Sequence, residues 1–181
     1  MAAAPSLPDL VSAGGRILAG LFNGGVRACL SWVMKDAPMA LVAATAQQTV
    51  PYATWTSIQL PQVRLDTGGL TGATPDTPSR IYIGRCLGWY AVQGVVATEN
   101  PTAGRLAARI ALNGAQVDTS IGHGGGTVPC IAMTPVTFVQ ATDPGDYIEV
   151  QALVIDATSD QTAIASWHSR SSLSATYLRT N

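Results

Sequence analysis

The hydrophobic pattern of the chain changes its period near residue 38. From residue 39 onward, apolar and polar residues alternate in short runs, which is typical of β-strands with one buried face. In the run 89–98, this alternation puts Trp89 and Tyr90 on opposite faces, so we expect one in the core and the other at a surface or interface. In the run 147–155, the expected core positions are Ile148, Val150, Ala152 and Val154.

Short runs of this kind predict an antiparallel β-sandwich. Residues 66–79 have the composition of a loop, and Asn113-Gly114 is a turn signal, since both residues tolerate positive φ. Strands do not alternate with helices, which excludes a parallel α/β sheet. The predicted fold class is all-β, a jelly-roll β-sandwich over residues 39–181. We expect strands at 39–48, 55–60, 80–86, 89–98, 105–112, 131–140, 147–155 and 163–178, the last of which has room for two.

The segment before residue 38 follows a helical period instead. Residues 15–35 carry an amphipathic stripe that ends before Pro38, and Gly24 and Gly25 interrupt it. Each interior glycine costs about 1 kcal/mol relative to alanine, so this helix should be stable only when docked. We therefore assign residues 1–38 to a leader and amphipathic helix for attachment, packed within the chain, within an oligomer or on a neighbouring protein. The residues expected to mediate assembly are Leu18, Phe22, Val26 and Trp32.

The chain is poor in charge. Of its 181 residues, 47% are hydrophobic and 12% are charged, whereas about 25% charged residues is usual. Residues 37–63 carry no formal charge, and neither do residues 119–142 when His123 is neutral. Such a surface favours burial against other subunits, so we predict an oligomer.

Composition also narrows the classes of partner and compartment. The net charge is -1 and there is no basic patch to follow phosphates, which argues against direct nucleic-acid binding. No apolar run reaches the length of a transmembrane helix, and the N-terminus lacks the pattern of a signal peptide. Cys29, Cys86 and Cys130 lie far apart without a CxxC, which argues against a disulfide framework or a zinc site. We expect folding in a cytoplasm without membrane insertion.

Several short motifs occur in a particular order along residues 45–181. They are Gln47-Gln48, Thr54-Trp55-Thr56, Asp66, Gly88-Trp89-Tyr90, Arg109 before Asn113-Gly114, Gly145-Asp146-Tyr147-Ile148-Glu149 and Leu173-Ser174-Ala175-Thr176-Tyr177-Leu178. Together they resemble the complement globular-head and tumour-necrosis-factor jelly-roll superfamily, in its bacteriophage and bacterial branch.

The N-terminal segment resembles a second group, the predicted minor tail proteins of phages that infect actinobacteria. These often begin with a short helix containing an Asn and an Arg, here Asn23 and Arg27, with Leu30-Ser31-Trp32 and Pro38 following. That group more often has a charged residue after the Arg, whereas this chain has Ala28. The resemblance implies a homotrimeric virion protein, assembled in the bacterial cytoplasm, with the strand-rich domain as head and the helix as attachment.

Two histidines are candidates for chemistry. His123 lies in a glycine-rich segment, 122–126, that would approach a phosphate or metal, but no GKS/T ending or second ligand follows. We interpret it as a mobile or subunit-contacting loop. His168 with Asp156 or Asp160 would supply parts of a hydrolytic triad, but the chain has no nucleophile elbow.

An acidic cluster of Asp143, Asp146 and Glu149 is a candidate ion site, since some members of the resembled superfamily bind calcium. The spacing is not that of an EF-hand, and Asp146 is better interpreted as a turn residue whose carboxylate accepts nearby backbone N–H groups. We therefore predict no catalytic residue, no cofactor and no metal ligand.

The function predicted from these patterns is a non-enzymatic phage structural protein, a trimeric minor tail or tail-fibre component. Its partners would be itself, other virion proteins and a host cell-surface glycan. The exposed loops expected to face outward contain Asp66, Thr71, His123 and Thr127. One alternative is a capsid decoration trimer at local three-fold positions of the shell, and another is a carbohydrate-active hydrolytic domain that uses His168.

Overall fold

The computed structural model describes residues 26–32, 37–71, 79–98, 105–118, 120–124, 130–155, 161–163 and 171–179. The chain divides into two compact units, Met1–Ala37 and Pro38–Asn181. In the first unit, residues 26–32 are helical, while the rest of the helix predicted over 15–35 lies outside the described residues.

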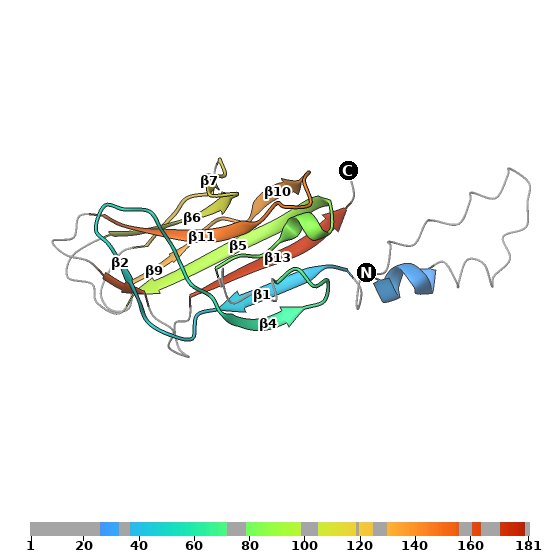
Figure 1. Ribbon diagram of the computed structural model, residues 1–181, viewed down its shortest axis with the longest axis horizontal. Helices are drawn as coiled ribbons and strands as arrows, with labels where there is room; N and C mark the ends of the chain where they lie inside the picture. The colour runs from blue at the N-terminus through green and yellow to red at the C-terminus, as the bar shows by residue number, and fades with distance from the viewer. Residues whose placement is uncertain are drawn as a thin grey trace, which may run out of the picture. The chain divides into compact units, whose positions relative to one another are not determined.

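The second unit is a sandwich of two antiparallel sheets (Figure 1). In the larger, eight-stranded sheet the order is β2-β12-β5-β13-β1-β4, and β9 and β10 pair with β5. Its strands are β1 (Met39–Ala43), β2 (Gln48–Val50), β4 (Gln62–Asp66), β5 (Gly88–Thr98), β9 (Cys130–Met133), β10 (Thr137–Ala141), β12 (Gln161–Ala163) and β13 (Ser172–Arg179).

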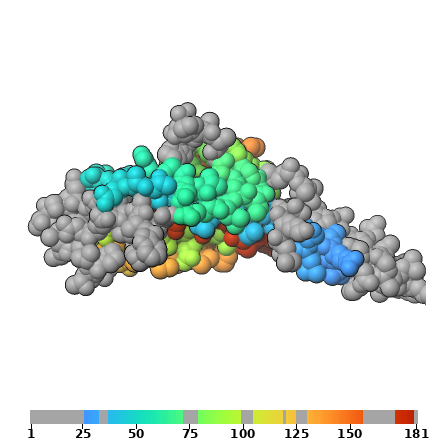
Figure 2. All heavy atoms as spheres, turned by 90° about the horizontal axis from the view of Figure 1, so that it is seen from below, coloured from blue at the N-terminus to red at the C-terminus, as the bar shows by residue number. Residues whose placement is uncertain are grey.

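The smaller, five-stranded sheet has the order β3-β11-β6-β7, and β8 pairs with β6. Its strands are β3 (Thr56–Ser57), β6 (Arg105–Leu112), β7 (Ala115–Gln116), β8 (Gly122–Gly124) and β11 (Ile148–Ile155). The segment that carries β2, β3 and β4 runs along the surface of the sandwich (Figure 2, cyan to green). The predicted all-β jelly-roll class is therefore confirmed.

The core lies between the sheets, where the predicted alternation places it. Ile148, Val150, Ala152 and Val154 of β11 are all at most 1% exposed, as the pattern predicts. Of Trp89 and Tyr90, which the pattern puts on opposite faces, Tyr90 is the one that is fully buried. Gly94 allows the two sheets to come close at this point, because a Cβ there would lie 2.6 Å from Cγ2 of Val150. The core depends on period-two burial from both sheets.

Four predicted strands differ from the observed ones. Of the strand expected at 55–60, only β3 (Thr56–Ser57) forms. The predicted strand 39–48 is two strands, β1 and β2, and 131–140 is divided between β9 and β10 at Thr134–Val136, where Pro135 has no N–H to donate. Residues 80–86 form only isolated bridges from Ile81 to Thr71 and Ile148 and a 3-10 turn, Ile83–Arg85. β4 was not predicted, because its burial does not alternate.

The segment 80–86 turns because it packs against the loop before β11. The Gly84 N–H donates to the Asp146 carbonyl at 2.8 Å. A Cβ on Gly84 would lie 2.2 Å from the Asp143 carbonyl oxygen, so only glycine fits this approach. The alternation of apolar residues in 80–86 therefore does not correspond to a strand.

Three buried hydroxyl groups accept backbone N–H groups at places where β5 or β6 changes from one partner strand to another. Thr134 Oγ1 accepts the Gly94 N–H at 2.9 Å between β9 and β10, and Ser171 Oγ accepts the Ala97 N–H at 3.1 Å. Ser120 Oγ accepts the Ile110 N–H at 3.2 Å. All three residues are at most 2% exposed. They satisfy backbone donors on β5 and β6 that the sheet ladder leaves without a partner, which buried amides require.

Candidate functional site

The outer surface of the eight-stranded sheet carries no charge over most of its area. Because directly opposite residues of antiparallel strands share a face, the pairing defines rows that cross this surface. One row is Phe138–Ala91–Thr176–Met39, and the next is Gln93–Ser174–Leu41–Leu65. We call this surface the apolar face; it comprises Met39, Leu41, Leu65, Trp89, Ala91, Gln93, Val95, Ile131, Met133, Phe138, Gln140, Ser172, Ser174 and Thr176.

Large apolar side chains stand along one edge of the apolar face. Phe138 on β10 is 62% exposed, and Met133 and Ile131 on β9 are 53% and 41% exposed. The residues of β13 in the middle of the face are small (Ser172, Ser174 and Thr176), and so is Ala91 of β5, which pairs with Thr176. Figure 1 shows β5, β13, β1 and β4 side by side in this layer.

This arrangement differs from that of a solvated sheet, whose outer residues are normally polar and often charged. Arg179 borders the apolar face opposite Trp89, and exposed Arg64 lies next to Leu65 on β4, so charge begins only at its margins. Contiguous exposed apolar surface of this kind marks a site of association. The half-buried Trp89 belongs to this face, while its neighbour Tyr90 lies in the core.

The outer surface of the five-stranded sheet is polar. Arg109 Nε donates to Gln151 Oε1 at 2.8 Å, and Gln151 Nε2 donates to Glu149 Oε1 at 2.7 Å. Arg80 Nε lies 3.8 Å from Glu149 Oε2, and Arg109 also donates to Gln116 at 3.1 Å. Glu149 is 5% exposed and Gln151 is 8% exposed. We call this chain of four side chains, Arg80, Glu149, Gln151 and Arg109, the polar ladder.

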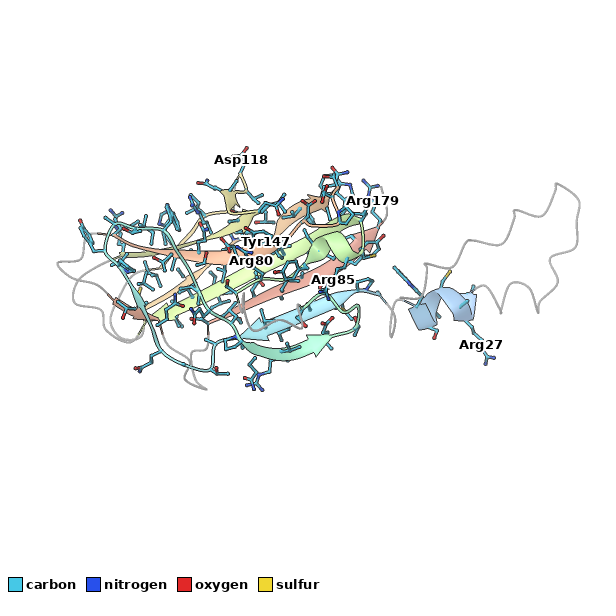
Figure 3. The ribbon with its side chains drawn as sticks, viewed as in Figure 1. Arg27, Arg80, Arg85, Asp118, Tyr147 and Arg179 are labelled. Carbon is cyan, nitrogen blue, oxygen red and sulfur yellow. The ribbon has the colours of Figure 1, made fainter. Side chains whose placement is uncertain are left out.

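An aromatic ring supports each arginine of the polar ladder. The Arg80 guanidinium carbon lies 3.8 Å from the centre of the Tyr147 ring, and that of Arg109 lies 4.1 Å from the centre of the Trp55 ring. Figure 3 shows Arg80 and Tyr147 next to each other on the sandwich. Partial burial lowers the pKa of Arg109, which the Glu149 carboxylate partly offsets. The guanidinium groups are therefore held in place by both charge and stacking.

Two of the residues predicted for exposed loops, Asp66 and Thr71, organise the loop after β4. The Asp66 carboxylate accepts backbone N–H groups of Gly68, Leu70 and Thr71 and the Thr71 hydroxyl. Burial raises the pKa of Asp66, but the hydrogen bonds outweigh it and the net pKa lies below its usual value. Both residues are half-buried, and Arg85 donates to the carbonyls of Gly69 and Thr71.

Of the other two predicted loop residues, His123 and Thr127, only His123 lies in the described part of the chain. His123 is exposed on β8, opposite Ala107 of β6, and thus lies on the outer surface of the five-stranded sheet. Its neighbours Gly122 and Gly124 let β9 approach, because a Cβ on Gly122 would lie 1.7 Å from the Met133 carbonyl oxygen. Thr127 lies outside the described residues.

The predicted assembly residues fall mostly where the chain is not described. Leu18 and Phe22 lie outside the described residues, as does His168 of the hydrolytic alternative. Val26, at the start of the helical residues 26–32, is 41% exposed, while Trp32 ends that segment. Their role in assembly stays a prediction.

The acidic residues considered for an ion site have separate partners. Asp146 accepts the N–H groups of Thr142 and Asp143 and the Asn113 amide, which confirms its interpretation as a turn residue. Glu149 instead faces Arg80. Within the described ranges, no three His, Cys, Asp or Glu side chains gather as a metal site. In those same ranges, no helix is long and apolar enough to cross a membrane.

The polar ladder was not predicted as a unit. The alternation in 147–155 places Glu149 and Gln151 on the polar face, which is the part of the signal that the sequence contains. Their contact with Arg109 depends on the pairing of Gln151 with Arg109 across β11 and β6, and Arg80 arrives from a loop. A single sequence does not specify that register.

Neither a family model nor a curated protein matches the chain, but solved structures do. The crystal structure of murine APRIL at pH 8.5 matches with a TM-score of 0.53 and 13% identity, over 78% of this chain and 98% of that chain. The structure of Eiger TNF from S. frugiperda matches with a TM-score of 0.51 and 12% identity, over 81% of this chain and 95% of that one. At such identity the similarity shows the fold alone, a jelly roll of the tumour-necrosis-factor type.

Proposed function

We propose that this protein is a non-enzymatic structural component of a bacteriophage virion, a homotrimer that serves as a minor tail or tail-fibre protein. The observation that carries the proposal is the apolar face. Phe138 is 62% exposed and Met133 is 53% exposed on a sheet surface without charge. Burial of that surface against identical copies removes apolar area from water at no cost in buried charge.

A second copy of this chain is the occupant that best fits the apolar face. The large side chains at the β9–β10 edge and the small residues of β13 are two different surfaces on one chain. A contact between two different surfaces is heterologous, and such contacts close into a ring when the rotation allows it. The resemblance of the motifs to a trimeric superfamily supports three copies in that ring.

The size of the apolar face supports a stable contact. Four strands about 4.8 Å apart and eight residues at about 3.4 Å per residue span a projected area of about 500 Å². Side-chain relief enlarges the accessible area beyond the projection. The result is of the same order as the roughly 800 Å² per partner that specific interfaces bury.

The place in a virion is proposed from the N-terminal segment. Met1–Ala37 is a different compact unit of the chain from Pro38–Asn181, and its sequence resembles the attachment helix of minor tail proteins. A separate unit of this kind suits attachment to another virion protein, while the sandwich stays free to trimerise. The exposed Val26 and Leu30, at 41% and 55%, are available for such a contact.

Two measurements test the proposal. Sedimentation equilibrium of the purified full-length chain should give the mass of a trimer, and a monomer at micromolar concentration would refute self-association. Quantitative mass spectrometry of purified particles should give a few to tens of copies. Hundreds of copies would place the trimer on the capsid as a decoration protein, and absence from particles would refute the virion role.

A further inference from the structure

The polar ladder holds two arginines side by side on the surface opposite the apolar face. Glu149 and Gln151 lie two residues apart on β11, and Arg80 contacts the first while Arg109 contacts the second. At about 3.4 Å per residue, the two guanidinium groups are anchored about 7 Å apart along the strand. This spacing lets both arginines contact neighbouring groups of one small ligand.

Both arginines keep donors that the described residues do not use. Arg80 contacts Glu149 through Nε alone, at 3.8 Å, so its two terminal nitrogens have no hydrogen-bond partner in the described part of the chain. Arg109 uses Nε for Gln151 and one terminal nitrogen for Gln116. In the described ranges, its second terminal nitrogen has no such partner. Terminal guanidinium nitrogens are the donors that bind carboxylates and phosphates in pairs.

The buried position of Glu149 determines the charge that the ladder presents to solvent. Its carboxylate is 5% exposed, and it accepts from Gln151 while it attracts Arg80. The negative charge is therefore nearly inaccessible, whereas the Arg80 side chain is 31% exposed, so the accessible side of the ladder is positive. Two arginines and one carboxylate sum to a charge of +1, so an anionic ligand makes the site neutral.

The neighbours of the arginines favour a saccharide over an isolated ion. Trp55 and Tyr147 are half-buried rings at the two ends of the ladder, and aromatic rings present π surface on which the C–H groups of a sugar pack. The side chains of Gln116 and Ser57 lie beside the ladder and can exchange hydrogen bonds with hydroxyl groups. Stacking and the carboxylate hold the arginines before any ligand arrives, which lowers the entropic cost of binding.

We infer that the polar ladder is a binding site for an anionic saccharide, with Arg80 and Arg109 pairing its carboxylate or phosphate groups. The site differs from the loops containing Asp66, Thr71, His123 and Thr127, which the sequence predicts to face outward. It requires neither the proposed trimer nor a virion location, because the ladder and the apolar face lie on opposite sheets. Failure of one proposal therefore leaves the other standing.

The test is isothermal titration calorimetry of the full-length protein with four probes. Trigalacturonic acid supplies carboxylates, its methyl ester is the neutral counterpart, a phosphorylated trisaccharide supplies phosphate, and hexaglutamate supplies carboxylates without a sugar. We expect one or both anionic saccharides to bind and the methyl ester to bind at least tenfold more weakly. The anionic saccharide that binds more tightly shows whether the site prefers a carboxylate or a phosphate group. Affinity should fall as salt rises.

Substitutions connect the binding to the polar ladder. Arg80→Gln and Arg109→Gln should each weaken binding of the preferred saccharide at least tenfold. Arg64→Gln, at an exposed arginine on β4 of the other sheet, is the matched control and should leave it unchanged. Sedimentation and thermal melting of each variant check that the fold and the oligomer are intact.

Several results would each overturn the inference. They are no binding of either anionic saccharide, equal binding of the methyl ester, equal or tighter binding of hexaglutamate, and a loss with Arg64→Gln as large as that with Arg80→Gln. Binding that survives Arg80→Gln and Arg109→Gln together, in folded protein, would likewise place the saccharide elsewhere.

Discussion

The substitution Phe138→Ser tests whether the apolar face holds copies of the chain together. Phe138 projects from β10, its ring is 62% exposed, and its partner Ala91 on β5 is small. The side chain therefore contributes little to the core of its own sandwich. Its removal should leave the monomer folded and weaken only the contact between copies.

The size of the effect follows from the exposed area. A phenylalanine of about 200 Å², of which 62% is exposed, offers about 120 Å² to a neighbour, worth about 3 kcal/mol at ~25 cal/mol per Å². Because incomplete burial reduces this figure, about 2 kcal/mol per contact is a fair expectation. At 1.4 kcal/mol per factor of ten, each contact weakens roughly 30-fold. A trimer has three such contacts, so its dissociation constant, in units of concentration squared, should rise roughly 10⁴-fold, and the concentration of half-dissociation should rise about a hundredfold.

Sedimentation velocity over a concentration series measures this shift. Phe138→Ser should be monomeric where the parent is trimeric, and Phe138→Leu should retain most of the association. Tyr52→Ser is the control, since Tyr52 is 48% exposed but bridges β11 of the five-stranded sheet. If Phe138→Ser stays as associated as the parent, or if Tyr52→Ser dissociates equally, the apolar face is not the interface.

Three further predictions concern stability. Thr134→Val leaves the Gly94 N–H without its acceptor and should cost about 1–3 kcal/mol in denaturant unfolding, whereas Thr134→Ser keeps the hydroxyl and should cost less; equal losses would contradict the role of that bond. Gly122→Ala places a Cβ 1.7 Å from the Met133 carbonyl oxygen, so we expect loss of soluble folded protein on expression, and a normal thermal melt would contradict the packing of β8 against β9. Burial raises the pKa of Asp146, but hydrogen bonds from Asn113, Asp143 and Thr142 outweigh it and leave a net pKa below the usual 3.8. A depressed carboxyl pKa stabilises the fold above about pH 4, and this contribution is lost as pH falls through the folded value. Asp146→Asn should therefore lower the melting temperature at pH 7 and flatten its decline between pH 4 and pH 2; an unchanged pH profile would refute this role.

Local chemistry determined much of this fold. The period-two pattern of 147–155 identifies its four core residues without reference to a partner strand, because successive side chains of any strand point to opposite sides. The Asn113-Gly114 turn is determined in the same way: both residues have positive φ, 52° and 81°, as their small or locally bonding side chains allow. The shortage of charge likewise predicted a protein with a surface to bury.

Tertiary structure decided where strands end and which side chains meet. β5 pairs with β13 along one side and with β9 and β10 along the other, and Thr134 fills the gap between the last two. The pairing of β11 with β6 brings Gln151 to Arg109, 42 residues away in sequence. Patterns along one chain report which face of a strand is buried, since that depends on neighbours in sequence. Register and partner choice depend on the packing of the whole sandwich, so the apolar face and the polar ladder emerge only from the folded chain.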